Sequence, residues 1–292
     1  MSGPAMLLHL ILERLSRREL LRVPEPKLIM DDPAQIAAFM ESGREDGILA
    51  FLYFYHALQV TPVVRPGDKV LDLACGPANQ LVQIARLNPN AHFVGLDASA
   101  NMLATARATL ARCAVGNVEL LAGDMTRLTD IDDAAMDCVT CTMSLHHLPD
   151  LAALAATMRE VRRVLKPGGG LYLADFGRLK RTSTQRFFAQ ARREHQPAQF
   201  TRDYLNSLKA AFSVGELSDA AALLGPGAVR HQTPLAPFMV IIKSAARRQL
   251  DATTRRLARE VYGRMTASQH ADFQAFARWF RVAGCGLPGA LP

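Results

Sequence analysis

The stretch Val70-Leu71-Asp72-Leu73-Ala74-Cys75-Gly76-Pro77-Ala78-Asn79 decides the fold of this chain. An apolar run enters a turn of small residues, and a helical pattern begins at about Asn79. The next apolar run, residues 91–96, stops at Asp97, which lies 21 residues after Gly76. This order predicts a strand, a small-residue turn, a helix, a second strand and an acid. It is the first half of a nucleotide-binding α/β unit, in which the acid accepts hydrogen bonds from ribose hydroxyls.

The size and composition of the chain are those of an ordinary globular protein. Its 292 residues are 49% hydrophobic and 21% charged, which suits one large domain or two modest ones. No apolar run reaches the roughly 18 to 20 residues that a membrane-spanning helix needs. The apolar residues 5–12 are followed by charged residues and by no small-residue cleavage site, so they do not form a secretory signal. We expect a cytoplasmic location.

The five cysteines are odd in number and irregular in spacing, which argues against a disulfide framework. Cys138 and Cys141 have a spacing typical of metal ligands, but they fall in a predicted strand. Residues three apart on a strand point to opposite faces of the sheet, so we do not expect the two thiols to share a zinc ion without another ligand pair. The sequence therefore predicts no metal site.

The net charge of +7 is unevenly distributed along the chain. Residues 1–27 carry +2, residues 178–209 carry +6 and residues 247–292 carry +5, which leaves −6 on the remainder. The basic segments are either solvated helix faces or, for residues 178–209, a surface that attracts an anionic substrate or an acidic partner.

The first 66 residues are predicted to be helical. A helix over residues 5–22 ends before Pro24, and a second, over residues 33–41, starts with Asp32 as its N-cap. A third helix, over residues 46–60, is rich in aromatic side chains.

Short apolar runs alternate with helical patterns in the next segment, which predicts a mostly parallel sheet covered by helices on both faces. The expected strands are residues 69–73, 92–96, 117–121, 136–141 and 169–175. The expected helices are residues 79–87, 99–112 and 150–165. Residues 166–170, with the sequence Lys-Pro-Gly-Gly-Gly, predict a sharp turn before the fifth strand.

A basic helical segment, residues 178–213, interrupts this alternation before a helix at about 216–224. Residues 228–234 and 237–243 then predict a reversed pair of strands at the sheet edge, and residues 247–262 and 269–281 predict two further helices. We therefore divide the chain into an N-terminal helical cap (1–66), an α/β domain (67–243) with a helical insertion (178–213), and a C-terminal helical extension (244–292).

The small-residue turn discriminates between nucleotide cofactors. An NAD site uses the pattern G-x-G-x-x-G, so that the pyrophosphate can lie against a helix N-terminus. Here the turn has one glycine, Gly76, beside a proline, and Asp72 lies just before it. That carboxylate would repel a pyrophosphate, but it suits S-adenosylmethionine (SAM), which carries an ammonium, a sulfonium and no phosphate.

The chain resembles the class I SAM-dependent methyltransferases of small molecules, near the ubiquinone and menaquinone C-methyltransferase-like group. The resemblance covers about residues 67–243. Its motifs, in order, are residues 70–76, Gly95-Leu96-Asp97, Gly123-Asp124, residues 137–147 and residues 165–170. It implies a Rossmann-like, seven-stranded, mostly parallel sheet whose last strand is antiparallel.

The resemblance also implies which residues bind the methionine end of SAM. Asp72 would lie near the ammonium. The loop residues that pass beneath the methionine would be Ala74, Cys75 and Gly76. The sulfonium side would be lined by Thr142, Met143 and Ser144. The chain departs from the family at Ala74 and Ala78, where glycine is usual and where an added methyl group disfavours positive φ.

At the other end of SAM, the resemblance implies that Asp97 accepts hydrogen bonds from both ribose hydroxyls. Ala98 and Met102 would lie beside the adenine, Asp124 would accept from its amino group, and the backbone of Met125 would donate to it. The structural alternatives are that Asp97 caps the next helix, that Asp124 caps a turn over residues 125–127, and that Cys75 is a packed loop residue rather than a nucleophile.

His146 and His147 follow the fourth strand, at the carboxyl edge where open α/β sheets bind ligands. Either histidine is a candidate catalytic base, and the alternative is that they pack beneath the following loop.

Candidate substrate residues come from two segments. Residues of the aromatic helix, which would form a pocket wall or pack in the core, are Tyr53, Tyr55 and His56. Arg192 and Arg193 lie in the basic insertion, where relatives place substrate-binding covers.

The expected activity is in-line methyl transfer from SAM to a small and, given the basic insertion, anionic or carrier-linked acceptor beneath a helical lid. The product would be S-adenosylhomocysteine. Two alternatives stay open: a SAM-binding scaffold with a degenerate site and a protein partner, and an RNA methyltransferase. The sequence ranks RNA last, because no RNA-binding module flanks the domain. The helical extensions are also a candidate homodimer interface.

Overall fold

The computed structural model describes residues 4–288, whose strands form one seven-stranded sheet with the order β3-β2-β1-β4-β5-β7-β6. Strands β1 to β5 are parallel, and β7 is antiparallel to both of its neighbours, which confirms the predicted fold class. The strands are β1 (Lys69–Leu73), β2 (His92–Asp97), β3 (Val118–Ala122), β4 (Met136–Thr142), β5 (Leu165–Asp175), β6 (Val229–Gln232) and β7 (Val240–Lys243).

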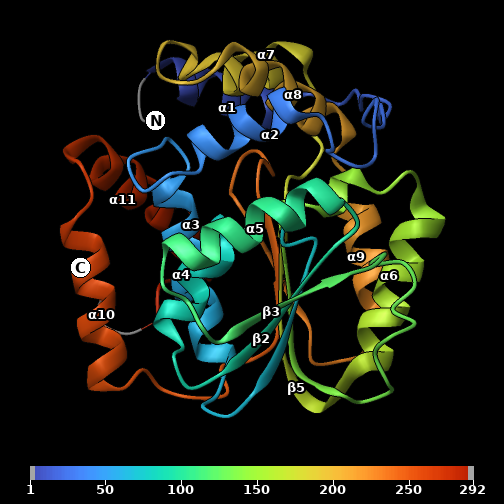
Figure 1. Cartoon of the computed structure of the whole chain (residues 1–292). Helices are drawn as coiled ribbons and strands as arrows, with labels where there is room; N and C mark the ends of the chain where they lie inside the picture. The colour runs from blue at the N-terminus through green and yellow to red at the C-terminus, as the bar shows by residue number, and fades with distance from the viewer. Residues whose placement is uncertain (1–3, 289–292) are drawn as a thin grey trace.

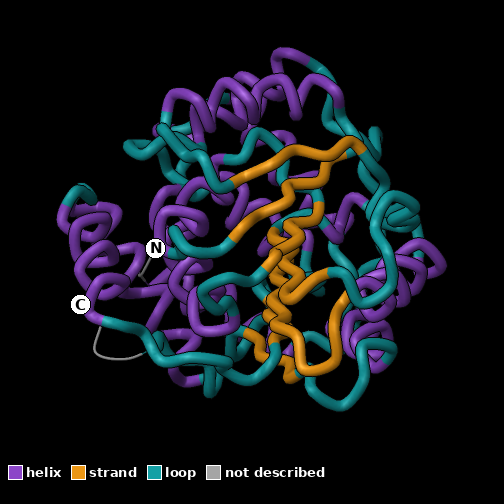
Figure 2. The backbone as a smooth tube through the Cα atoms, turned by 60° about the horizontal axis from the view of Figure 1, so that its bottom comes forward, coloured by secondary structure: helices purple, strands orange, loops and turns teal. Residues whose placement is uncertain are grey.

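Helices cover both faces of this sheet (Figures 1 and 2). One face carries α3 (Ala50–Val60), α4 (Asn79–Leu87) and α5 (Ala100–Arg112), with α10 (Ala252–Gly263) and α11 (Ala267–Val282) packed outside α4 and α3. The other face carries α6 (Leu151–Val164) and α9 (Val214–Ala222).

Side chains alternate between the two apolar cores because successive strand residues point to opposite faces. On β1, Val70 packs in the core beneath α3 and α4, and Leu71 packs in the core beneath α6 and α9. Cys138 and Cys141 of β4 fall in different cores in the same way, so the two thiols are separated by the sheet as predicted.

A third layer of helices lies over the carboxyl ends of the parallel strands (Figure 1). It consists of α1 (Pro4–Leu15), α2 (Pro33–Ser42), α7 (Thr182–Gln190) and α8 (Ala198–Ala210), together with the short 3₁₀ turn η3 (Arg193–His195). We call this layer the roof. Asp32 accepts hydrogen bonds from the backbone N–H groups of Ala34 and Gln35, so it caps α2 as predicted.

The segment between α1 and α2, residues 16–32, is called the strap. The predicted helix over residues 5–22 is too long, since α1 ends at Leu15. The strap forms hydrogen bonds with other parts of the chain instead of continuing the helix. The guanidinium of Arg22 donates to the carbonyls of Ala210 (2.6 Å), Pro149 (2.6 Å) and His146 (2.9 Å). The backbone N–H of Val23 donates to the carbonyl of Lys209. These bonds hold the strap against α8 and the loop after β4.

Two further predicted boundaries are wrong for similar tertiary reasons. Helix α10 starts at Ala252 rather than near 247, because the N–H groups of Arg247 and Arg248 both donate to the carbonyl of Pro62. Strand β5 starts at Leu165, and the expected turn at residues 166–170 is an irregularity within it, where Met136 pairs with Leu165 and Cys138 pairs with Gly170.

The division of the chain at residues 66 and 243 stays a prediction. One apolar core includes Leu10 of α1, Val70 of β1 and Phe280 of α11, so packing continues across both proposed boundaries. Within residues 4–288, no helix has both the length and the apolar character required to span a bilayer.

Candidate cofactor and substrate site

A cavity of about 600 Å³ lies between the carboxyl ends of the strands and the roof. This volume falls within the roughly 300–1,000 Å³ typical of small-molecule sites. All the residues expected to bind the cofactor border it: Asp72, Ala74, Cys75, Gly76, Asp97, Ala98, Met102, Asp124, Met125, Thr142, Met143 and Ser144. The parallel strands bring these loops together because their carboxyl ends share one edge of the sheet.

Asp72 is a buried carboxylate at the floor of this cavity. Its Oδ1 accepts a hydrogen bond of 2.6 Å from the hydroxyl of Thr140, and no cationic side chain pairs with it among the described residues. Burial raises the pKa of Asp72 to about 7, and the neighbouring Asp97 adds to the effect. A positively charged ligand group would therefore be stabilised here, whereas a phosphate would be repelled.

Asp97 is held in place by the loop that it faces. Its Oδ2 accepts from the N–H of Gly76 and its Oδ1 from the N–H of Ser99, each at 2.8 Å. The cap of α5 is Ser99, whose hydroxyl accepts from the N–H of Met102, so the alternative that Asp97 is the helix cap is wrong. Burial raises the pKa of Asp97 despite these bonds. Each carboxylate oxygen retains a lone pair for a ribose hydroxyl.

Backbone strain is concentrated in the loop beneath the expected methionine. Ala74, Gly76 and Ala78 have φ values of +51°, +54° and +62°. Only glycine adopts this left-handed region at little cost, so the two alanines store strain of roughly 1–2 kcal/mol each. Met143, at the end of β4, is strained in the same way with φ +56°. Strands β1 and β4 are thus each followed by a non-glycine residue with positive φ that borders the cavity.

The structural alternatives are correct for Asp124, which caps a turn, and for Cys75, which is a packed loop residue. Asp124 is exposed, and its Oδ1 accepts from the N–H of Thr126 at 2.8 Å, so it caps the turn over residues 125–127 while bordering the cavity. Burial and the nearby carboxylates of Asp72 and Asp97 raise the pKa of the Cys75 thiol well above its usual value. Cys75 is therefore not an activated nucleophile.

His146 is fixed by an acid that the sequence reading missed. Both oxygens of Asp175, at the end of β5, bind it: Oδ1 accepts from Nδ1 at 2.7 Å, and Oδ2 accepts from the backbone N–H at 2.8 Å. Both side chains are buried, so Nε2 is the ring nitrogen left for a ligand. The sequence signal that could have identified Asp175 is its position as an acid at the end of the strand next to β4.

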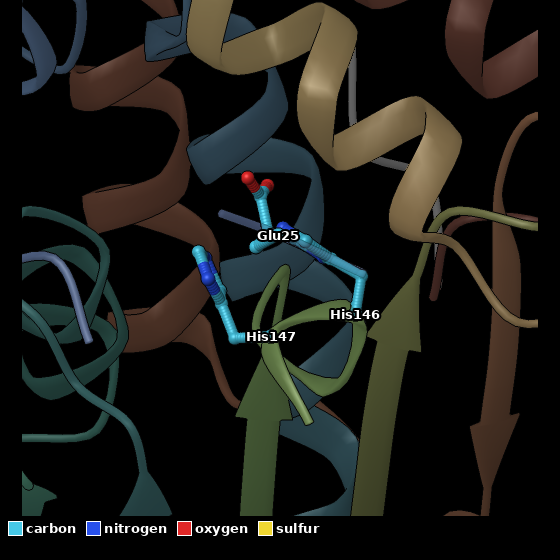
Figure 3. Close-up of side chains that lie close together, drawn as sticks. All are labelled: Glu25, His146 and His147. Carbon is cyan, nitrogen blue, oxygen red and sulfur yellow. The ribbon is translucent and has the colours of Figure 1, made fainter. Parts of the chain in front are cut away.

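Glu25 of the strap is a second residue that the sequence reading missed. Its carboxylate accepts from the hydroxyl of Ser207 at 2.8 Å and lies close to the rings of His146 and His147 (Figure 3). Burial raises the pKa of Glu25. No local pattern could have found it, since the strap lies more than 100 residues before the two histidines in the sequence.

Of the three aromatic-helix candidates, only Tyr53 borders the cavity. Tyr55 is buried against α11, where its ring stacks on Phe280. His56 is buried against the sheet, with Nδ1 2.6 Å from the hydroxyl of Tyr172. The prediction that Tyr55 and His56 form a pocket wall is therefore wrong: Tyr55 lies about 200° around the helix from Tyr53, and His56 is directed to Tyr172 of the sheet.

The two arginine candidates are also separated. Arg192 borders the cavity, but its guanidinium pairs with Asp272 of α11, 2.6 Å from Oδ1. Arg193 is exposed outside the cavity, so the prediction that it contacts substrate there is wrong. The charged residues of the lining, apart from Arg192 and the histidines, are Asp72, Asp97, Asp124, Asp203 and Asp272. This excess of carboxylates does not favour an anionic acceptor.

Comparison with known proteins agrees with this geometry. A family model described as a methyltransferase domain matches residues 70–169. A demethylmenaquinone methyltransferase of Listeria monocytogenes is 38% identical over 113 residues, which are 38% of this chain and 46% of the relative. A protein of the same name from Bacillus cytotoxicus is 36% identical over 107 residues, which are 36% of this chain and 44% of the relative. The matched segment thus spans less than half of these curated relatives.

The fold is shared with solved structures as well. A SAM-dependent methyltransferase from Aquifex aeolicus has a TM-score of 0.53 at 17% identity, covering 74% of this chain and 98% of that one. The residues present also fit SAM: the uncompensated buried carboxylate of Asp72 would suit its ammonium, and that of Asp97 would suit its ribose hydroxyls. Sheet order, domain match and relatives agree: residues 70–169 match the methyltransferase domain family, and the chain shares the fold of SAM-dependent methyltransferases.

Proposed function

We propose that this protein transfers a methyl group from SAM to a small, largely apolar acceptor held beneath the roof. The observation that carries the proposal is a single cavity that joins the cofactor loops to His146 and to apolar roof residues. The acceptor side includes Phe39, Phe200 and Phe238. Arg192, the one arginine of residues 4–288 that borders the cavity, is neutralised by an ion pair. These features support an uncharged aromatic acceptor in place of the anionic one expected from the sequence.

The names of the relatives give the first acceptor to test. Two of them are called demethylmenaquinone methyltransferase, although they match only part of this chain. Demethylmenaquinone is apolar and aromatic, which suits the phenylalanine-rich side of the cavity.

The chemistry asks mainly for positioning and for exclusion of water. Bound SAM supplies an electrophilic methyl group and departs as a neutral thioether that needs no proton. Asp72 and Asp97 would anchor the two ends of the cofactor, and the roof would hold the acceptor about 3 Å from the methyl carbon. Nε2 of His146, oriented by Asp175, offers a lone pair on the acceptor side of the cavity.

Calorimetry with SAM, followed by transfer of labelled methyl groups to the reduced (quinol) form of demethylmenaquinone, whose ring carbon is nucleophilic, tests this proposal. We expect binding in the micromolar range that Asp97→Ala weakens at least tenfold and that Asp130→Ala, an exposed control, leaves unchanged. Absence of SAM binding would overturn the proposal. Tight binding without turnover on any apolar acceptor would instead favour the scaffold alternative, which the strained Ala74 and Ala78 motivate.

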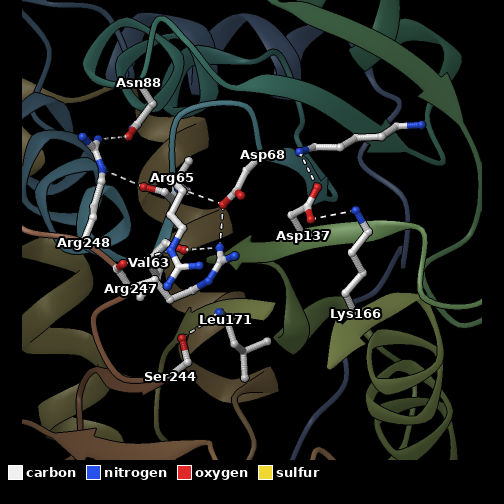
Figure 4. Close-up of polar contacts among 12 residues, drawn as sticks. Val63, Arg65, Asp68, Asn88, Asp137, Lys166, Leu171, Ser244, Arg247 and Arg248 are labelled. Atoms are coloured by element: carbon white, nitrogen blue, oxygen red, sulfur yellow. Dashed lines mark hydrogen bonds and ion pairs between the residues drawn. The ribbon is translucent and has the colours of Figure 1, made fainter. Parts of the chain in front are cut away.

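The RNA alternative is weakened because several basic side chains are paired within the fold. Near the base of the sheet, Arg247 pairs with Asp68 and Arg248 with Asn88 (Figure 4). In the insertion, Arg178 pairs with Glu216. A cytoplasmic location and a homodimer through the helical extensions stay predictions, which cell fractionation and sedimentation would test.

A further inference from the structure

Three potential metal ligands meet at the boundary between the strap and the loop after β4. Glu25, His146 and His147 each offer one ligand atom, and these atoms all lie within 4.8 Å of one another (Figure 3). Two imidazoles and one carboxylate form a common ligand set for divalent transition metals, with coordination positions left open.

The separation of these atoms is compatible with one shared ion. Because no pair is more than 4.8 Å apart, some point lies no more than about 2.8 Å from all three atoms. Zinc bonds to histidine nitrogen and carboxylate oxygen are about 2.0–2.2 Å long, so each ligand would have to move inward by less than about 1 Å. Side-chain rotation within the strap can provide such a movement.

Each histidine is already in the state that a metal requires. Asp175 accepts from Nδ1 of His146, which fixes the ring and leaves Nε2 as the donor atom, as in many carboxylate–histidine–metal sites. Nδ1 of His147 is buried without a hydrogen-bond partner among the described residues. Burial also lowers the pKa of His147 to about 3, so its ring stays neutral.

Glu25 supplies the charge. Its carboxylate is partly buried, and Ser207 is the one hydrogen-bond donor that the described residues give it. The nearby cation, Arg22, directs its guanidinium to backbone carbonyls instead. A divalent cation would compensate this carboxylate and satisfy the orphaned ring nitrogen at the same time.

We propose that Glu25, His146 and His147 bind one divalent transition-metal cation, with zinc as the first candidate. The ion would link the strap to the loop after β4, which carries both histidines. A fourth coordination position would face the cavity that both histidines border, where an acceptor oxygen could bind. Metal binding at this site does not depend on the proposed methyl transfer, because all three ligands belong to the protein.

The test uses the full chain freed of metal by chelation, titrated with Zn²⁺ by calorimetry and with Co²⁺ by visible absorption. We expect one equivalent to bind, Glu25→Gln and His147→Gln each to weaken binding at least tenfold, and Asp175→Asn to weaken it roughly 10–100-fold. Glu19→Gln, an exposed strap acid, should bind like the parent protein.

SAM affinity, measured in parallel, reports whether each variant is folded and separates failure of this proposal from failure of the proposed function. The proposal is overturned if the parent protein takes up no stoichiometric metal. It also fails if folded Glu25→Gln binds metal as the parent does, since the metal would then be held without the carboxylate of Glu25.

A second, independent feature is the outer surface of α1 and the strap. Of the twelve large apolar side chains that are exposed in the described part of the chain, eight lie here, with 40–90% of their surface accessible: Leu7, Leu8, Ile11, Leu15, Leu21, Val23, Leu28 and Ile29. The four on α1 follow the spacing of one helix face. Concentrated exposed apolar surface marks an interaction site.

The charges and the position of this surface identify its partner. The exposed cations Arg14, Arg17, Arg18 and Lys27 are interspersed with the apolar residues and outnumber the two exposed acids of this surface, Glu19 and Asp31. Leu28 and Ile29 also border the cavity, so the apolar surface leads into it. A second copy would bring like charges together across a two-fold axis, whereas an anionic lipid surface complements them.

We infer that α1 and the strap dock on an anionic membrane surface. If the proposed function holds, this docking lets an apolar acceptor enter the cavity without crossing water. Sedimentation with phosphatidylcholine vesicles, with and without phosphatidylglycerol, tests the docking alone. We expect binding that requires phosphatidylglycerol, falls with salt, and drops at least tenfold in Leu8→Ser with Leu15→Ser but not in Val282→Ser, an exposed control on α11.

Equal sedimentation of the parent protein and the double variant would overturn this inference. So would a parent dimer in solution that the double variant dissociates, because a second copy would then cover the surface.

Discussion

Asp175 holds His146 at two points, through Nδ1 at 2.7 Å and through the backbone N–H at 2.8 Å. The acid ends β5 and the histidine follows β4, its parallel neighbour, so the sheet itself sets their separation. This relationship fixes the direction of Nε2 of His146. Proton transfer by this histidine, or metal binding to it, would take place at that atom.

Asp175→Asn should therefore impair turnover more than cofactor binding. An amide cannot accept through both of its polar atoms, so the ring loses one of its two constraints. We expect a kcat about 10–100-fold lower with an unchanged Kd for SAM. An equal loss of SAM affinity would show that Asp175 supports the cofactor loops instead of the histidine.

The affinity for SAM should depend on pH through Asp72. The pKa of this carboxyl is about 7 in the empty site, and a bound ammonium favours its ionised form. Below pH 7 the group must lose a proton on binding, so affinity should fall up to about tenfold per pH unit. Calorimetry from pH 5.5 to 8.5 should show this slope in the parent protein and not in Asp72→Asn.

The same group predicts how stability changes with pH. The folded pKa of about 7 lies above the ordinary aspartate value of 3.8, so the ionised form is the one that folding penalises. The protonated carboxyl therefore gives its full contribution to the free energy of unfolding below about pH 4. This contribution is lost as the pH rises through 7. At pH 8 without ligand, Asp72→Asn should raise the free energy of unfolding by up to about 4 kcal/mol. Denaturant curves that show no gain would contradict the burial argument.

Ala74→Gly should relieve strain in the cofactor loop. Ala74 has φ +51°, which glycine adopts readily. We expect the free energy of unfolding to rise by up to about 1 kcal/mol and SAM to bind at least as tightly. The matched control is Ala108→Gly on the exposed side of α5, which should lose about 1 kcal/mol. Weaker SAM binding in Ala74→Gly would mean that the methyl group positions the cofactor.

The arginines of the insertion should affect structure rather than substrate charge. Arg192 pairs with Asp272 across the cavity wall, while Arg193 is exposed. We expect Arg192→Ala to cost about 1 kcal/mol of stability, measured by denaturant unfolding, and Arg193→Ala to cost nothing measurable. A raised KM for an anionic acceptor in Arg193→Ala would restore the substrate role that the sequence suggested.

The strands of the sheet and the loops that border the cofactor side of the cavity could be predicted from the sequence alone. The strands are short apolar runs, and small or acidic residues follow them at the cavity edge; both patterns are local in the sequence. Parallel strands then collect their carboxyl ends automatically, which is why Asp72, Asp97 and Thr142 share one cavity although they are distant in sequence.

The residues that line the acceptor side of the cavity depend on tertiary packing and could not be predicted from local patterns. Which face of the aromatic helix meets the cavity depends on the packing of α11, so Tyr53 lines it and Tyr55 does not. Glu25 reaches the histidines because Arg22 binds carbonyls far along the chain. Arg192 loses its free charge because α11 supplies Asp272. Contacts between segments so far apart leave no periodic trace in the sequence, and they form only when the whole chain has packed.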